Sequence, residues 1–235
     1  NADVRIQGFE DAKLIDDFYD IVISNVPFGD YQLAEEDYNK YKFYIHDHFI
    51  AKSIDKVRPG GIVMVITSSG TMNSERSAKL RAYANSKADF VGAIRLPSDA
   101  FKANAGTEVT TDIIVLRKRL PGEKPSGEAW MKTVPTGMKG KFGDILKNNE
   151  YYVEHPEMML GKLAEDKLYP GRIALNPDGR DLGEALSEAF KHLPQDIMTK
   201  LKHPPTEEFE PRDMIPAPGT VKEGAFVIQG GKVYV

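Results

Sequence analysis

The feature that most constrains the fold is a set of short, nearly continuous apolar runs separated by segments of helical spacing. The run at residues 62–66, Ile-Val-Met-Val-Ile, has no polar position, as expected of a strand covered on both faces. Alternation of such strands with amphipathic helices predicts an α/β fold with a mostly parallel sheet. The expected strands are residues 4–7, 20–24, 62–67, 90–96 and 112–118.

Two helices are predicted between these strands. Apolar residues recur at helical spacing from residue 41 to residue 57 and give a broad stripe that would pack on the sheet. The sequence Arg-Pro-Gly-Gly at 58–61 predicts the end of this helix, because proline cannot continue a helix and glycine permits the turn. A second helix is predicted over residues 74–86.

The composition changes after residue 120. Residues 121–127 combine proline, glycine and serine, which is typical of a linker. We therefore expect a catalytic half-domain at 1–120, a helical accessory region at 121–203, and a tether rich in proline and acidic residues with a terminal β-hairpin at 204–235. Helices are predicted at 155–165 and 182–201, the second kinked or divided at Pro194. Two β-branched runs around Gly230 and Gly231 predict the hairpin.

Composition excludes several classes of site. The 235 residues contain no cysteine, which rules out disulfides and thiolate metal sites. No apolar run approaches the length of a membrane span and no leader is present, so a cytoplasmic protein is expected. The net charge of −4 shows no overall basic character. Most contacts with the phosphates of any nucleic acid are therefore expected from segments outside this chain. Because the chain begins at Asn1, it is interpreted as a fragment.

The most informative segment follows the predicted strand at 20–24. Asn25 comes at the carboxyl end of that strand, where α/β folds place their ligands, and Val26, Pro27 and Phe28 follow it. An exocyclic amine on a base is a poor nucleophile, because its lone pair is conjugated into the ring. Two acceptors, the side-chain oxygen of Asn25 and the main-chain carbonyl of Val26, would turn that lone pair toward a methyl donor. Phe28 would stack on a base swung out of the helix.

Residues 25–28, Asn-Val-Pro-Phe, resemble the Asn-Pro-Pro-Tyr catalytic motif of adenine-N6 DNA methyltransferases. The turn at 95–101 and the strand at 110–116 also resemble the end of the sheet in that family. The likeness covers about residues 1–120 and implies a class I methyltransferase fold, Rossmann-like, with an antiparallel last strand. By this resemblance, Phe101 would pack against the extruded base, and Gly8 and Phe9 would line the adenine pocket. Phe101 could equally be a core residue.

The form of the motif with valine in second place, followed by Gly29, Asp30 and Tyr31, resembles large phage and plasmid proteins. In those proteins methyltransferase and helicase parts share one chain. The resemblance implies DNA as substrate, a fused helicase, and a bacterial or phage-encoded restriction-modification or mobile-element origin. The stretch at 149–161 also resembles a segment that follows the catalytic domain there.

Two departures from the family pattern affect the expected activity. Val26 replaces a proline, which keeps the carbonyl but loses the fixed φ. No glycine-rich loop precedes Asn25 and no acidic residue follows a neighbouring strand, so the residues that bind S-adenosylmethionine are expected in a missing amino-terminal half of the domain. We therefore expect weak or absent cofactor binding, no activity of the fragment alone, and a dimer or a bound partner chain covering the incomplete sheet.

Other interpretations remain open. An Asn-x-Pro-aromatic sequence is often a plain turn. Glutamine-amide protein methyltransferases use a similar motif, although the turn at 96–101 favours the DNA enzymes, and a non-catalytic docking or DNA-binding module is a third hypothesis. No metal site is predicted, because His46 and His48 are two residues apart on a helix and point to different faces. Residues 67–71 are expected to form a strand-end loop near the active site.

Overall fold

The structure is a computed structural model that describes residues 4, 6–102, 106, 108–167 and 169–198, and two strands near the carboxyl terminus. The chain divides into two compact units, residues 1–200 and 201–235. In the second unit, β9 (Val227–Gln229) pairs antiparallel with β10 (Lys232–Tyr234), which confirms the predicted hairpin. The predicted tether at 204–219 lies outside the described residues.

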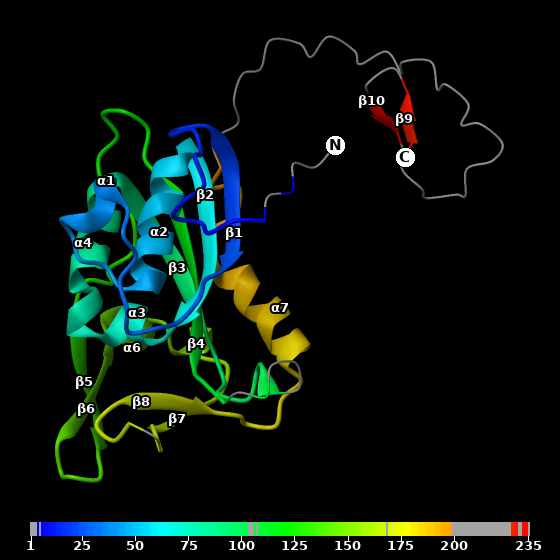
Figure 1. Ribbon diagram of the computed structural model, residues 1–235. Helices are drawn as coiled ribbons and strands as arrows, with labels where there is room; N and C mark the ends of the chain where they lie inside the picture. Colours follow the sequence, from blue (N-terminus) through cyan, green and yellow to red (C-terminus); the bar gives the residue numbers. More distant parts are fainter. Residues whose placement is uncertain are drawn as a thin grey trace. The chain divides into compact units, whose positions relative to one another are not determined.

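A four-stranded sheet forms the centre of the first unit, in the order β1-β2-β4-β3 (Figure 1). Its strands are β1 (Tyr19–Asn25), β2 (Val57–Ser68), β3 (Ala88–Leu96) and β4 (Thr111–Lys118). β1 and β2 are parallel, whereas β4 runs antiparallel to both β2 and β3. This mixed α/β sheet with an antiparallel last strand confirms the predicted fold class. The carboxyl ends of β1, β2 and β3 consequently lie along one edge, called here the carboxyl edge.

Helices cover both faces of the sheet (Figure 1). On one face lie α2 (Ile45–Lys56) and α4 (Ala78–Lys87), which bury Ile50, Ile54 and Leu80 against the strands. On the other face α7 (Leu182–His192) packs its apolar side, including the buried Ala189. Short elements complete this part: α1 (Glu36–Asn39), α3 (Gly70–Asn73) and a 3-10 turn, η1 (Glu75–Ser77).

Several predicted boundaries are wrong near the sheet. Val4 and Ile6 are not in a strand and are 82% and 100% exposed, because no described strand pairs with them to satisfy their backbone groups. The first helix begins at Ile45 instead of residue 41, since Tyr41 stacks on Phe43 at 5.0 Å ahead of the helix. The predicted turn at 58–61 lies within β2, where the pairing register with β1 shifts.

The described region between β4 and residue 198 contains two strand hairpins as well as helices, which corrects the predicted helical accessory region. It contains two antiparallel hairpins, β5 (Thr133–Lys139) with β6 (Ile145–Asn149) and β7 (Lys162–Glu165) with β8 (Ile173–Asn176). Between them lie α6 (Glu150–Glu154) and η2 (Pro156–Met158). The helix predicted at 155–165 is therefore wrong, because residues 162–165 pair with β8. α7 ends at His192, ahead of Pro194.

This strand-rich region packs on the same core as the sheet. The buried ring of Trp130 stacks on Phe90 of β3, with ring centroids 4.6 Å apart. The buried Asn149 donates from its amide to the carbonyls of Met72 and Trp130, both at 2.8 Å. The hairpin β5–β6 is thereby fixed to the segment that follows β2.

A buried ion pair ties β3 to β4 at the carboxyl edge. The Arg95 guanidinium donates to both oxygens of Asp112, at 2.7 and 2.8 Å, and to the side-chain oxygen of Asn148 on β6 at 2.7 Å. Burial alone lowers the pKa of Arg95, but the Asp112 carboxylate more than offsets this and holds that pKa above its ordinary value. The Arg95 side chain also lies over the Tyr152 ring, 4.3 Å from its centre. The network joins the sheet to the β5–β6 hairpin.

Among the residues that the structure describes, no helix has the length and apolar character needed to span a bilayer.

Candidate active site

The segment at residues 25–28, called here the motif loop, leaves the sheet at the carboxyl edge. Asn25 is the last residue of β1 and pairs in register with Ile66 of β2. β2, the strand that pairs with β1, is largely buried. The position of Asn25 is therefore set by sheet pairing and not by a free loop.

The backbone of the motif loop is fixed at Val26. Val26 is 2% exposed, and its N–H donates to the Ile66 carbonyl at 3.0 Å. Within the described residues, no group donates to the Val26 carbonyl, and the exposed Asn25 side chain forms no hydrogen bond. Sheet pairing thus replaces the fixed φ that a proline would supply at this position. Two oxygen acceptors are held at the end of β1 with no partner of their own.

Aromatic rings follow these acceptors. Phe28 is 41% exposed and Tyr31 is 55% exposed. The Tyr31 carbonyl accepts from the N–H of Ile45 at 2.9 Å, which joins this segment to the first turn of α2. A Cβ at Gly29 would lie 2.6 Å from the Tyr31 ring, so glycine allows the close approach of loop and ring. The segment presents an exposed ring beside the acceptors.

Phe101 lies beyond the far strand of the sheet, on the turn that follows β3. Three strand spacings separate β1 from β3, or roughly 14 Å. The Phe101 ring is partly buried and packs against the hydrophobic core. The sheet therefore places Phe101 on the same edge as Asn25 but anchors its ring in the core.

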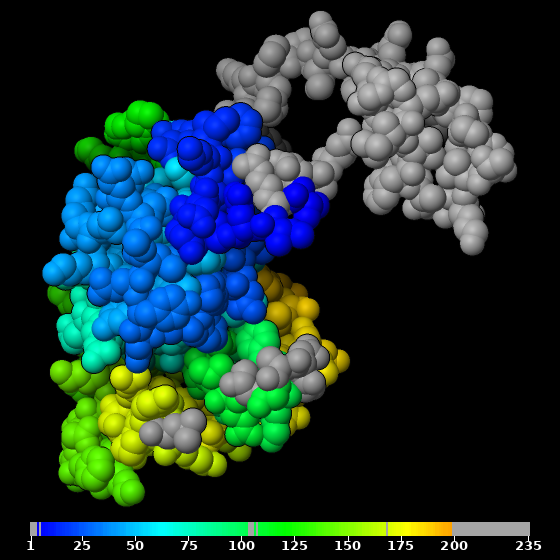
Figure 2. Space-filling view, in the orientation of Figure 1, coloured from blue at the N-terminus to red at the C-terminus, as the bar shows by residue number. Residues whose placement is uncertain are grey.

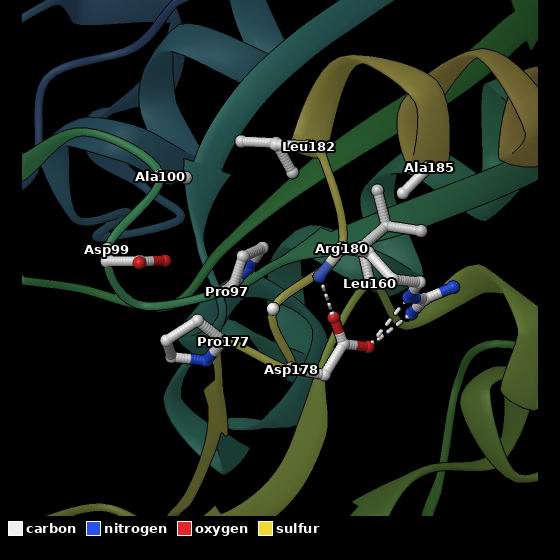
Figure 3. Close-up of a pocket in the computed structure, with 10 residues that line it drawn as sticks. Pro97, Asp99, Ala100, Leu160, Pro177, Asp178, Arg180, Leu182 and Ala185 are labelled. Atoms are coloured by element: carbon white, nitrogen blue, oxygen red, sulfur yellow. Dashed lines mark hydrogen bonds and ion pairs between the residues drawn. The ribbon is translucent and has the colours of Figure 1, made fainter.

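The turn before Phe101 lines a cavity of about 270 Å³ (Figure 3). Pro97, Asp99 and Ala100 form one wall, and the segment between β8 and α7 forms another. On that second wall Asp178 pairs with Arg180, with an Nε to Oδ2 distance of 2.7 Å. The Ser98 N–H also donates to the Leu175 carbonyl at 2.7 Å. This turn is held by β8 as well as by β3.

The Gly8 carbonyl accepts from the Asp11 N–H at 3.1 Å, and Phe9 lies against α2. The Phe9 ring is 4.7 Å from that of Phe49, and the Phe9 carbonyl accepts from the buried ammonium of Lys52 at 2.6 Å. Lys52 also pairs with Glu35 at 2.8 Å. The described contacts of Phe9 are thus with the helix, and the structure does not bring it into contact with the motif loop.

The three residues at 46–48 have separate environments. His48 Nε2 lies 2.7 Å from a Glu35 carboxylate oxygen, whereas His46 Nε2 lies 3.5 Å from Asp47. Burial lowers the pKa of His46 and raises the pKa of the Asp47 carboxyl to about 7, although a hydrogen bond from Ser77 and the charge of Arg81 oppose the latter. Within the described residues, no group of three candidate side chains could hold a metal ion.

A second cavity, called here the hairpin cleft, was not predicted from the sequence. Its volume is about 510 Å³, and it lies between the segment after β2 and the hairpins β5–β6 and β7–β8. Ser68, Ser69 and Gly70, in the loop expected near the active site, form part of its wall. Lys147, Tyr169 and Arg172 contribute from the hairpins. Only the pairing of segments far apart in the sequence creates this cleft.

A mixed sheet with an antiparallel last strand, and an Asn-x-Pro-aromatic loop at the carboxyl end of a parallel strand, define a class I methyltransferase arrangement. Residues 3–96 match the family model described as Eco57I restriction-modification methylase. This match confirms the resemblance to restriction-modification methyltransferases predicted from the motif loop.

A curated relative is Defense against restriction protein B of Escherichia phage P1, which is 30% identical over 209 residues. The match covers 80% of this chain and only 8% of that protein, so the chain spans a small part of the relative's length.

Two solved structures are also similar. One is a putative class I S-adenosylmethionine-dependent methyltransferase from Listeria monocytogenes, 25% identical, with a TM-score of 0.40, covering 50% of this chain and 37% of that one. The other is a modification subunit of a putative type I restriction enzyme from Vibrio vulnificus, 16% identical, with a TM-score of 0.38, covering 75% of this chain and 40% of that one.

Proposed function

We propose that this chain provides the target-base half of a DNA methyltransferase that methylates adenine at N6. The observation that carries the proposal is the pair of unpartnered acceptors at the end of β1, the Asn25 side chain and the Val26 carbonyl, beside the exposed ring of Phe28. The restriction-modification description of the matching family supports DNA as the substrate.

We propose that S-adenosylmethionine is held mainly outside the described residues. Ahead of β1, no described strand and glycine-rich turn leads into a helix, and β1 is the outer strand of the sheet. We expect this chain alone to bind the cofactor weakly or not at all. Strands that would hold the cofactor belong to another part of the domain, which would pair with the outer edge of β1. A fused helicase is a further proposed partner, based on the motif variant.

The residues of this chain would act on the amine of the base. The Asn25 oxygen and the Val26 carbonyl would each accept one amine hydrogen, which withdraws the lone pair from the ring and directs it away from the acceptors. Phe28 would stack on the base after extrusion from the duplex. A base of matched pKa is not required, since the proton can leave after methyl transfer. When bound, the cofactor supplies an electrophilic methyl group.

The test measures the single-turnover rate at which the longer parent protein methylates duplex DNA that contains adenine. Asn25→Ala is expected to slow methylation about a hundredfold, because one oriented hydrogen bond in the transition state contributes on the order of 3 kcal/mol. Cofactor affinity, measured by calorimetric titration, should be unchanged. Phe28→Ala should weaken capture of the base, and Phe28→Tyr should be tolerated.

Two results would contradict the proposal. If Asn25→Ala methylates DNA at the parental rate, the motif loop is a structural turn. If the parent methylates a glutamine side chain of a protein and leaves adenine unchanged, the same acceptors serve an amide substrate. Mass spectrometry of the methylated nucleoside distinguishes N6-methyladenine from methylation at other base positions.

A further inference from the structure

Two hairpin turns carry exposed aromatic rings, each with a cation beside it. Phe142, in the β5–β6 turn, is 76% exposed, and Tyr169, in the β7–β8 turn, is 58% exposed. Lys141 Nζ lies 6.0 Å from the centre of the Phe142 ring, and the Arg172 guanidinium lies 5.1 Å from that of Tyr169. These four residues are called here the paired tips.

Glu165 at the end of β7 holds the two turns together. Its carboxylate oxygens accept from the backbone N–H of Lys141 and from that of Gly171, each at 2.8 Å. The hairpins lie side by side at the lower end of the molecule (Figure 2). Because both anchors are backbone groups, the side chains of the paired tips remain available to a ligand. A rigid presentation also reduces the entropy lost on binding.

The charge around the tips is opposite in sign to that of the whole chain. Residues 139–147 and 165–172 contain five basic and three acidic side chains, whereas the chain has a net charge of −4. Two of the acidic side chains serve the turns: Glu165 as described, and Asp166, which accepts from the Tyr169 N–H at 3.0 Å. The third, Asp144, is exposed. The local excess of positive charge favours an anionic ligand.

The β5–β6 and β7–β8 hairpins lie beyond the carboxyl ends of β1 and β2 (Figure 1). Tyr169 and Arg172 line the hairpin cleft together with Ser68 and Ser69 at the end of β2. β2 is the strand that pairs with Asn25. A nucleic acid bound at the motif loop therefore has a second surface to contact, which the two hairpins form.

We infer that the paired tips bind the DNA that flanks the target base, an inference that rests on the proposed function. Phe142 and Tyr169 would stack on bases or insert at a base step, and Lys141 and Arg172 would neutralise phosphates. Aromatic rings can stack on any base because every base has a π face. Two rings separated by charged residues fit a nucleic acid better than a protein partner, which would require a continuous apolar patch.

The experiment measures binding of a fluorescently labelled duplex by the full chain and by the parent protein, using anisotropy at several salt concentrations. Phe142→Ala and Tyr169→Ala are each expected to weaken binding about tenfold. Lys141→Ala should reduce the slope of log affinity against log salt by about 1. Matched controls are Phe18→Ala, a ring 60% exposed at the other end of β1, and Lys40→Ala, an exposed lysine after α1. Both should bind like the parent.

Normal binding by Phe142→Ala and Tyr169→Ala would overturn the inference, as would a parent protein with no affinity for duplex DNA. The outcomes separate this inference from the proposed function. If Asn25→Ala stops methylation while the tip variants bind normally, only the inference fails. If the tip variants lose binding while Asn25→Ala methylates at the parental rate, the inference stands and the role of the motif loop fails. Unchanged thermal unfolding of the tip variants shows that they fold.

Discussion

Single residues at the carboxyl edge show what the sequence pattern could predict. Asn25 follows an apolar strand, and sheet pairing places it at the strand's end as the pattern indicated. The backbone of the adjacent Val26 is fixed by a hydrogen bond to Ile66, forty residues later, which no local sequence pattern indicates. The buried partners of Arg95 were not predictable, because Asp112 and Asn148 approach it only through tertiary pairing.

Asp47 makes stability depend on pH. Its carboxyl is 1% exposed, and burial raises its pKa from 3.8 to about 7. The folded state therefore keeps a proton that the unfolded chain releases near its ordinary pKa. The stability from this group is complete below pH 3.8 and is lost progressively as the pH rises to about 7.

The corresponding variant is Asp47→Asn, which stays neutral at every pH. Between about pH 5 and 7 its free energy of unfolding should rise relative to that of the wild type, by at most about 1.4 kcal/mol per pH unit. Urea unfolding at both pH values measures this difference. The exposed Asp37→Asn variant should show no such trend, and a flat difference for Asp47→Asn would contradict the assignment.

For strands and helices, the prediction succeeded where a local apolar run determines the element. It failed where the element depends on pairing with a distant segment. The four sheet strands were predicted because each contains a short apolar run, as at residues 21–23 and 113–116. The strand expected at 4–7 failed, since an apolar run without a neighbour cannot satisfy its backbone. The segment at 155–165 has apolar residues at helical spacing, yet it forms only one 3-10 turn, Pro156–Met158, and residues 162–165 pair with β8. In the hairpins β5–β6 and β7–β8 the strands are joined by longer turns, and no local sequence pattern indicates their pairing.

The β5–β6 hairpin depends on one buried amide. Asn149 is 0% exposed, donates to two carbonyls, and caps α6 by accepting from the Tyr151 N–H at 3.1 Å. Asn149→Ala leaves these carbonyls unpaired and removes the cap, so we expect a loss of about 2–5 kcal/mol in the free energy of unfolding.

Asp181→Ala is the matched comparison, because the Asp181 side chain caps α7 through the Glu184 N–H at 2.9 Å and makes no buried bond. That variant should lose only about 1 kcal/mol. Denaturant unfolding of both variants tests the difference, and equal losses would show that the buried bonds of Asn149 contribute little.

For the whole molecule, the outer edge of β1 is the largest unsatisfied feature of the described chain. Ile21 and Ile23 are 48% and 73% exposed, and β1 pairs with a strand on one side only. An exposed apolar edge promotes pairing with another chain. We expect the isolated chain to self-associate, and the rest of the methyltransferase domain to compete for the same edge.

Ile23→Lys should reduce this association, because a charge on an edge strand opposes pairing. Sedimentation velocity at increasing protein concentration measures the effect. Val153→Lys, at a residue 47% exposed on α6, controls for loss of apolar surface away from β1. A wild-type chain that remains monomeric at every concentration would refute the expectation.

The insertion of β4 between β2 and β3 also constrains the order in which the chain can fold. β2 and β3 do not pair with each other, so the interior of the sheet closes only when residues 111–118 arrive. During synthesis, β3 leaves the ribosome before β4 and has no strand in this sheet to pair with until β4 follows. A fragment that ends before Thr111 lacks β4 and retains β2 and β3 with no shared neighbour. β4 is therefore the strand that unites the sheet, and its residues set a minimum length for any truncated form in which this sheet folds.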